Sequence, residues 1–211
     1  PHLIDLQDVG GMSDVTIVSH EVRIGAMVTQ ADIIDNTELT AVVPILREAA
    51  LQIADPQVRY MGTVGGNIAN GDPGNDMPGL MQCMDATFTL VGPNGERSVQ
   101  ARDFYEAAYI TAREDDEILT AVTIPLHSGG YAYEKQKRKI GDYATAAAAV
   151  QITKDNGSCA SAAIAMTNLS DTPVYSEAAG VALVGGTLDD TSLKASVAAM
   201  LNDIDPTEDN R

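Results

Sequence analysis

The chain has 211 residues, of which 13 are Lys or Arg and 30 are Asp or Glu, so its formal net charge is −17. This charge excludes nucleic acid and anionic membranes as default partners, because both are themselves negatively charged. The length allows one or two domains with a hydrophobic core, and no apolar run is long enough for a membrane span. The two cysteines, Cys83 and Cys159, lie far apart without metal-type spacing. We therefore expect a cytoplasmic protein with two buried thiols and no direct membrane insertion.

The first 60 residues predict a β-hairpin followed by two helices. Runs rich in β-branched residues at 15–18 and 21–24 form the expected hairpin. Apolar residues spaced three to four apart predict a helix over 29–36 and a second helix over 39–53. Asp55-Pro56 is expected to end the second helix, because proline lacks the backbone N–H that a helix needs.

A glycine-rich stretch follows at residues 62–79, with six Gly and two Pro. It contains too many breakers for one regular element, so it is either an ordered loop with a purpose or a flexible one. After it, the sequence predicts a short helix over 77–84. A hairpin is expected next, with strands 87–91 and 97–101 joined by the turn at 92–95, and then a strand over 118–124.

The clearest domain boundary is the small, flexible segment His127-Ser128-Gly129-Gly130. It predicts a first domain over residues 1–126 and a second over residues 131–211. Helix propensity favours a helix at Ala144–Ala149, but the following residues lead directly into the hairpin turn Asp155-Asn156-Gly157. We therefore predict strands there. The second-domain elements are strands 131–138, 145–153 and 159–168, helices 177–184 and 193–201, and a disordered tail at 206–211.

The segment Thr63-Val64-Gly65-Gly66-Asn67 has the composition of a phosphate-binding loop. Adjacent glycines let backbone amides approach a ligand without interference from Cβ, and flanking Thr and Asn add polar groups. The competing interpretation is a simple chain turn. Neither the dinucleotide fingerprint nor the P-loop pattern is present, which excludes those two nucleotide sites.

Other polar residues do not form a catalytic or metal-binding motif. The four-residue spacing of Asp72 and Asp76 matches no calcium loop, so these carboxylates are expected to accept hydrogen bonds from ribose hydroxyls or backbone amides. His2, His20 and His127 are scattered and lie in no nucleophile motif. We therefore predict no catalytic residue and no metal ligand.

Four basic residues crowd into five positions of this acidic chain: Lys135, Lys137, Arg138 and Lys139. Three interpretations remain open for them, namely a cofactor phosphate, an acidic partner subunit and a solvated strand end. The nearby aromatic ring of Tyr143 suits packing against a flat heterocycle.

Residues 53–62, 63–78 and 137–146 resemble the medium, FAD-binding subunits of aerobic molybdenum-containing carbon monoxide dehydrogenases. These subunits belong to the wider family of molybdenum hydroxylase flavoproteins, which includes xanthine dehydrogenase. The resemblance extends over residues 1–186, and its most specific feature is a Thr-Val-Gly-Gly-Asn loop followed nine residues later by Asp. It implies an α+β fold with an FAD-binding domain of the molybdenum hydroxylase flavoprotein type and a smaller α+β C-terminal domain. Against the family pattern, the sequence looks truncated at both ends, without an N-terminal second glycine loop and a C-terminal helix.

The resemblance also implies which residues bind FAD. The loop is expected to line the pyrophosphate, Asp76 to bind the same cofactor, and Tyr143 to lie beside the isoalloxazine ring. Two strand residues, Leu119 and Lys135, are weaker candidates. The full implied set is Thr63, Val64, Gly65, Gly66, Asn67, Asp76, Leu119, Lys135 and Tyr143.

The implied function is electron relay. FAD in this subunit would receive electrons from [2Fe–2S] clusters in a small subunit during oxidation of CO at a molybdopterin cofactor in a large subunit. A quinone-linked external acceptor would then be reduced. The implied assembly is a heterohexamer, a dimer of heterotrimers. Two alternatives are the flavin subunit of another molybdenum hydroxylase, acting on xanthine or an N-heterocycle, and a flavin-free assembly fragment.

Overall fold

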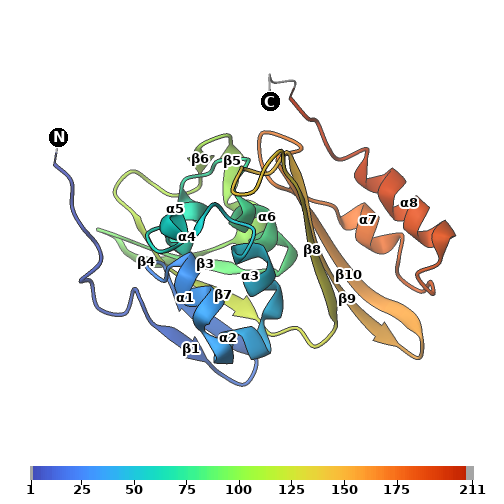
Figure 1. Ribbon diagram of the computed structural model, residues 1–211, viewed down its shortest axis with the longest axis horizontal. Helices are drawn as coiled ribbons and strands as arrows, with labels where there is room; N and C mark the ends of the chain where they lie inside the picture. Colours follow the sequence, from blue (N-terminus) through green and yellow to red (C-terminus); the bar gives the residue numbers. More distant parts are fainter. Residues whose placement is uncertain (1, 208–211) are drawn as a thin grey trace.

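The computed structural model describes residues 2–207 and contains two large antiparallel sheets, with helices between and beside them, and a small two-stranded sheet (Figure 1). Helices α3 (Pro44–Ala50) and α6 (Asp76–Cys83) lie between the sheets. Helices α7 (Glu177–Val181) and α8 (Asp190–Met200) cover the far face of the second sheet. The expected α+β class is confirmed.

The first sheet has the strand order β1-β2-β7-β3-β4. Its central strand, β7, is long and buried along much of its length, which suits a position paired on both sides. Both predicted hairpins of this region are confirmed, β1 with β2 and β3 with β4. The strands are β1 (Val15–Ile17), β2 (Glu21–Gly25), β3 (Thr87–Gly92), β4 (Gly95–Gln100) and β7 (Ile118–Pro125).

The predicted helix over 39–53 is wrong, because the chain forms two shorter helices there. Helix α2 (Thr37–Val42) ends at Val43, and Pro44 begins α3, since proline is tolerated at the first helical position but not inside a helix. Asp55-Pro56 also opens a helix, α4 (Pro56–Arg59), whose first turn is capped by the Asp55 carboxylate accepting from the Val58 amide at 2.9 Å. Helix α1 (Gln30–Asp35) starts as expected, with a capping box between Thr29 and Asp32.

The glycine-rich stretch is ordered and contains more helix than its composition predicts. Helix α5 (Val64–Ala69) lies inside it, and α6 confirms the helix expected at 77–84 to within one residue. Beyond them lie a short 3₁₀ turn, η1 (Ala101–Asp103), and a small hairpin of β5 (Tyr105–Ala107) and β6 (Ile110–Thr111).

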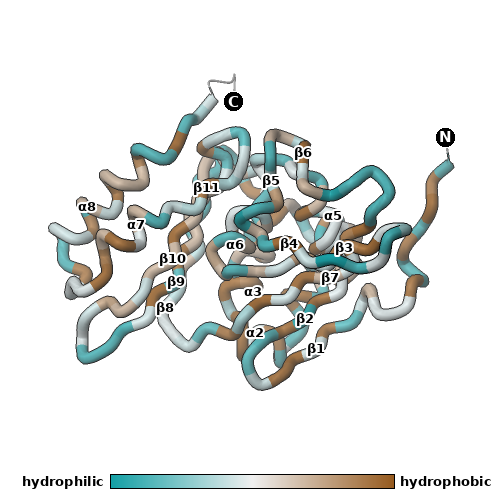
Figure 2. Tube along the Cα trace, turned by 180° about the vertical axis from the view of Figure 1, so that it is seen from behind, coloured by the Kyte–Doolittle hydropathy of each residue, from teal (hydrophilic) through white to brown (hydrophobic). Residues whose placement is uncertain are grey.

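The second sheet has the order β11-β10-β9-β8, with β8 (Gly130–Gln136), β9 (Ala146–Asp155), β10 (Ser158–Thr167) and β11 (Val174–Tyr175). Strand structure at 146–149 is confirmed over helix, because β9 and β10 meet at a turn in which Asn156 and Gly157 both have positive φ. This turn is hydrophilic, as Figure 2 shows. Of the tail expected to be disordered, residues 208–211 lie outside the described residues.

One hydrophobic core joins the two sheets through α6. Met77, Leu80 and Met81 of this helix are fully buried in the same cluster as Phe88 of β3 and Ala149 of β9. A smaller cluster packs α7 and α8 on the outer face of the second sheet. The predicted domain boundary falls on the connection between β7 and β8. Among residues 2–207, no helix is long and apolar enough to cross a membrane.

Candidate cofactor site

Helix α5 carries the predicted phosphate-binding motif and is held against the chain that follows β2. Thr63 caps the helix, and its hydroxyl accepts from the Gly66 amide at 3.0 Å. The Val64 amide donates to the Val28 carbonyl at 2.9 Å, and the Gly65 amide donates to the Ala26 carbonyl at 2.8 Å. The adjacent amides therefore fix the helix in place, which differs from the expectation that they face a ligand.

The two glycines of the motif have different surroundings. Gly65 is buried, and a Cβ added there would lie 2.4 Å from the Ala26 Cβ and 2.8 Å from its carbonyl oxygen. Gly66 is exposed, and a Cβ added there would closely approach only the Thr63 hydroxyl, at 2.8 Å. Gly65 thus permits close packing of the backbone, whereas Gly66 leaves a bare backbone surface toward the outside.

A chain of contacts connects this surface to Tyr143. The Asn75 carboxamide donates to the Asn67 carbonyl at 2.9 Å, and the Asn67 carboxamide oxygen accepts from the Met77 amide at 3.2 Å. Beside Asn75, Gly74 lies against Tyr143, since a Cβ on Gly74 would be 3.3 Å from the ring. Tyr143 itself is 57% exposed. The bare backbone at Gly66 and the exposed ring are thus joined by one short, ordered loop.

Asp72 shapes that loop, in agreement with the sequence interpretation that a carboxylate here accepts backbone hydrogen bonds. Its carboxylate accepts from the Gly74 amide at 2.9 Å and from the Tyr109 hydroxyl at 3.1 Å. No group of three or more His, Cys, Asp or Glu suited to a metal ion occurs within the described part of the chain. Gly66 and Tyr143 fit one side of a dinucleotide site, because a glycine without a side chain leaves room for phosphates and an exposed aromatic ring suits a flat heterocycle.

Asp76 and Lys135, both predicted cofactor residues, contact each other. The Lys135 ammonium donates to the Asp76 carboxylate at 2.8 Å and to the Gln52 carbonyl at 3.2 Å. The Tyr133 hydroxyl donates to the other Asp76 oxygen. Burial, and next the Asp76 charge, raise the pKa of Tyr133 well above its usual value, so the hydroxyl remains a donor. The side chains of Lys135 and Asp76 are only 1% and 5% exposed. This buried cluster joins α6 to β8.

Leu119, the remaining candidate, lies on β7 opposite Leu90 of β3 and is 5% exposed. Its side chain belongs to the main core. The structure thus gathers the predicted residues into an outward group at Thr63, Gly66, Asn67 and Tyr143, and a buried group that supports it: Val64, Gly65, Asp76, Leu119 and Lys135.

Two residues of this region were missed by sequence reasoning. Ala26 packs directly against Gly65, and the sequence feature that indicates such a close contact is the pair of small residues Gly25-Ala26. Tyr133 completes the buried cluster. The sequence feature that indicates it is its position two residues before Lys135, because residues two apart in a strand lie on the same face.

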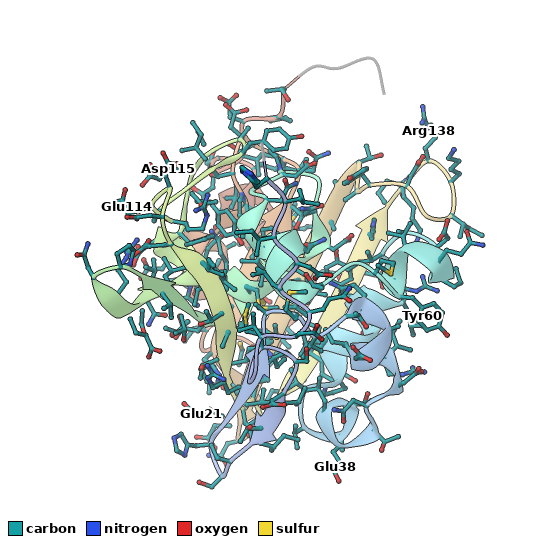
Figure 3. All side chains as sticks on the ribbon, turned by 90° about the vertical axis from the view of Figure 1, so that its left-hand side faces the viewer. Glu21, Glu38, Tyr60, Glu114, Asp115 and Arg138 are labelled. Atoms are coloured by element: carbon teal, nitrogen blue, oxygen red, sulfur yellow. The ribbon has the colours of Figure 1, made fainter. Side chains whose placement is uncertain are left out.

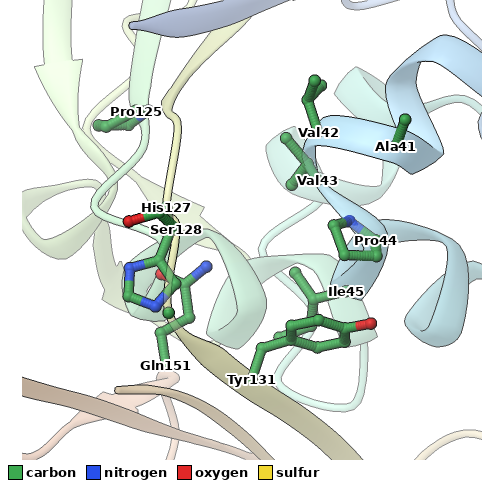
Figure 4. Close-up of a pocket in the computed structure, with 11 residues that line it drawn as sticks. Ala41, Val42, Val43, Pro44, Ile45, Pro125, His127, Ser128, Tyr131 and Gln151 are labelled. Atoms are coloured by element: carbon green, nitrogen blue, oxygen red, sulfur yellow. The ribbon is translucent and has the colours of Figure 1, made fainter. Parts of the chain in front are cut away.

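A cavity of about 150 Å³ lies elsewhere, where the linker between β7 and β8 faces α2 and α3 (Figure 4). Val43 and Pro44 line one side, and His127 and Gln151 the other. The His127 ring nitrogen already contacts the Ile152 carbonyl at 3.0 Å. None of the predicted cofactor residues lines this cavity.

Both cysteines are buried and unbridged, as expected. Burial raises the pKa of the Cys83 thiol to about 12, and the Sγ donates to the Ala163 carbonyl at 3.4 Å. At pH 8 the reactive thiolate form of Cys83 is then on the order of one part in ten thousand of the total thiol.

We expect a disulfide reagent at pH 8 to modify neither thiol of the folded protein within minutes, and to modify both thiols in guanidinium chloride. Rapid modification of Cys83 in the folded protein would contradict the buried position.

Comparison with known proteins identifies the family. Residues 1–127 match the FAD-binding domain in molybdopterin dehydrogenase, and residues 131–211 match the CO dehydrogenase flavoprotein C-terminal domain. The chain therefore belongs to the flavoprotein family of the molybdopterin dehydrogenases.

Within this family, the chain is similar to medium chains of carbon monoxide dehydrogenase. It is 53% identical to that of Afipia carboxidovorans and 39% identical to that of Hydrogenophaga pseudoflava, each over 212 residues, 100% of this chain and 74% of the relative. Among solved structures, reconstituted CO dehydrogenase from Oligotropha carboxidovorans matches with a TM-score of 0.97 at 54% identity, over 99% of this chain and 74% of that one.

Proposed function

We propose that this chain is the FAD-binding, electron-transferring subunit of an aerobic carbon monoxide dehydrogenase. The observation that carries the proposal is the 53% identity to a CO dehydrogenase medium chain along the whole chain, through both domains. The outward group at Thr63, Gly66, Asn67 and Tyr143 supports it, because it offers uncovered backbone at Gly66 for phosphates and an exposed aromatic ring for a flat heterocycle.

The residues of the chain act by binding and orientation. Thr63, Gly66 and Asn67 would hold the pyrophosphate, Tyr143 would pack beside the isoalloxazine ring, and the buried group keeps their backbone fixed. FAD bound there would supply the redox chemistry of an electron relay between [2Fe–2S] clusters and a quinone-linked acceptor.

The proposal includes the partners. The relatives are medium chains of multi-subunit enzymes, and we propose a small iron–sulfur subunit and a large molybdopterin subunit as partners here, in a heterohexamer of two heterotrimers. The cytoplasmic location is likewise proposed, and it rests on the two unbridged cysteines.

The test is the visible spectrum of the chain purified together with its partner subunits. We expect flavin absorption bands that bleach when CO is added without oxygen and return when a quinone is added. Xanthine and quinoline serve as controls and are expected to leave the bands unchanged. Bleaching by a heterocycle but not by CO would favour another molybdenum hydroxylase, and a complex without flavin bands would favour an assembly role.

A further inference from the structure

The small hairpin of β5 and β6 lies near α5 and the loop that follows it (Figure 1). Tyr109, at the tip of this hairpin, bonds to two successive residues of that loop. Its amide donates to the Gly71 carbonyl at 2.8 Å, and its hydroxyl donates to the Asp72 carboxylate at 3.1 Å. The hairpin also packs closely here, since a Cβ on Gly71 would lie 3.1 Å from the Thr111 methyl carbon. The hairpin tip therefore holds the loop through both backbone and side chain.

Tyr109 makes these bonds from a strained backbone conformation. Its φ is 63°, in the left-handed region that a bulky side chain rarely adopts. Burial does not account for this conformation, because the side chain is 63% exposed. The chain just beyond β6 is also at the surface, where Glu114 and Asp115 project from the edge of the molecule (Figure 3). A strained residue persists where its surroundings hold it and is often found at a functional site, and the bonds to the loop do so here.

Asp72 extends the contact from Tyr109 to Tyr143. One carboxylate oxygen accepts from the Tyr109 hydroxyl, and the other accepts from the Gly74 amide at 2.9 Å. Gly74 in turn lies against the aromatic ring, since a Cβ there would be 3.3 Å from the Tyr143 ring and 3.4 Å from the same Asp72 oxygen. Three successive contacts thus connect the Tyr109 hydroxyl to the exposed ring at the candidate cofactor site.

We propose that Tyr109 is a positioning residue for the flavin, which acts through Asp72 to fix the ring of Tyr143 against the isoalloxazine ring. The inference rests on the proposed function, which places Tyr143 beside that ring. Without the hydroxyl, the carboxylate keeps its bond to the Gly74 amide but is no longer held to the hairpin. A tyrosine ring in contact with a flavin quenches its fluorescence and alters its reduction potential, so a displaced Tyr143 is directly observable.

The test is made in the complex of all three subunits, with variants that remove a single hydroxyl. Tyr109→Phe removes the bond to Asp72 and keeps the ring. Tyr131→Phe is the matched control, because Tyr131 is an exposed tyrosine of β8 that lines the separate cavity beside His127. The measurements are amide hydrogen exchange of residues 71–75, FAD content, and the fluorescence and reduction potential of bound FAD.

Tyr109→Phe is expected to loosen the loop without removing the cofactor. Loss of one hydrogen bond to a charged acceptor raises the population of the opened loop at least about tenfold, so exchange of the Gly74 amide accelerates by the same factor. FAD is retained, its fluorescence rises and its potential shifts, because the ring of Tyr143 is less firmly held. Tyr131→Phe leaves all four measurements unchanged.

A second background tests the route through the carboxylate. Asp72→Ala removes both of its side-chain bonds and is expected to produce the same changes as Tyr109→Phe or larger ones. When the two substitutions are combined, Tyr109→Phe adds nothing further, because the group through which it acts is already absent.

Four outcomes would overturn the inference. Faster exchange with unchanged fluorescence and potential would confine Tyr109 to holding the loop, and loss of FAD from Tyr109→Phe would assign it to binding instead of orientation. A full effect of Tyr109→Phe in the Asp72→Ala background would show that Tyr109 reaches the flavin without Asp72. A wild-type complex without flavin bands would refute the proposed function together with this inference, whereas flavin bands that bleach with CO but do not respond to Tyr109→Phe would refute this inference alone.

Discussion

The variant Asp76→Ala is expected to lower the free energy of unfolding by about 3–5 kcal/mol, because it leaves the Lys135 ammonium charged, buried and without its carboxylate. The hydroxyl of Tyr133 loses the same acceptor. The measurement is urea unfolding followed by circular dichroism. Asp142→Ala is the control, since Asp142 pairs with Arg138 at 3.4 Å on the surface and its removal is expected to cost less than about 1 kcal/mol.

This experiment also separates two roles for Asp76. If the carboxylate mainly joins α6 to β8, the flavin-free protein loses stability, and the double variant Asp76→Leu with Lys135→Met recovers much of it, because a buried ion pair can be replaced by apolar contacts. If Asp76 acts mainly on the cofactor, flavin-free Asp76→Ala unfolds like the wild type, and only FAD retention falls. Equal costs for Asp76→Ala and Asp142→Ala would contradict the buried cluster.

Features governed by local chemistry were predictable from the sequence. The hairpin of β9 and β10 follows from Asn156-Gly157, whose positive φ angles suit the turn. The break before α3 had a signal as well, because Pro44 interrupts the apolar repeat that otherwise runs from 39 to 53.

Features governed by tertiary contacts were not predictable in this way. Helix α5 contains adjacent glycines with poor helix propensity, and it forms because Thr63 caps it and residues 26–28 accept its first amides. Asp76 and Lys135 lie 59 positions apart, so no local pattern pairs them, and family resemblance assigned each separately to the cofactor. Only the fold shows that these two charges meet.

The variant Gly66→Val is expected to remove FAD while preserving the fold. A side chain at this exposed position meets only the Thr63 hydroxyl inside the protein, so the cost in stability is about that of a weakened helix cap, ~1 kcal/mol. On the outside, the branched side chain occupies the space predicted for phosphate. The clash between this side chain and the phosphate is expected to lower FAD affinity by at least about a hundredfold, which corresponds to ~2.7 kcal/mol.

Gly65→Val is the matched control, because it places the same side chain one residue earlier on the same helix. There the Cβ lies 2.4 Å from that of Ala26 and 2.8 Å from the Ala26 carbonyl, so the backbone of α5 has to move away from β2. We expect a loss of unfolding free energy of about 3 kcal/mol or more, measured without FAD. The two variants thus differ in what they lose: Gly65→Val loses unfolding free energy because Gly65 lies in the packing of α5, and Gly66→Val loses FAD because Gly66 lies where the phosphates are expected. Full flavin content in a folded Gly66→Val protein would remove α5 from the cofactor site, and equal stabilities would show that α5 is not held against Ala26.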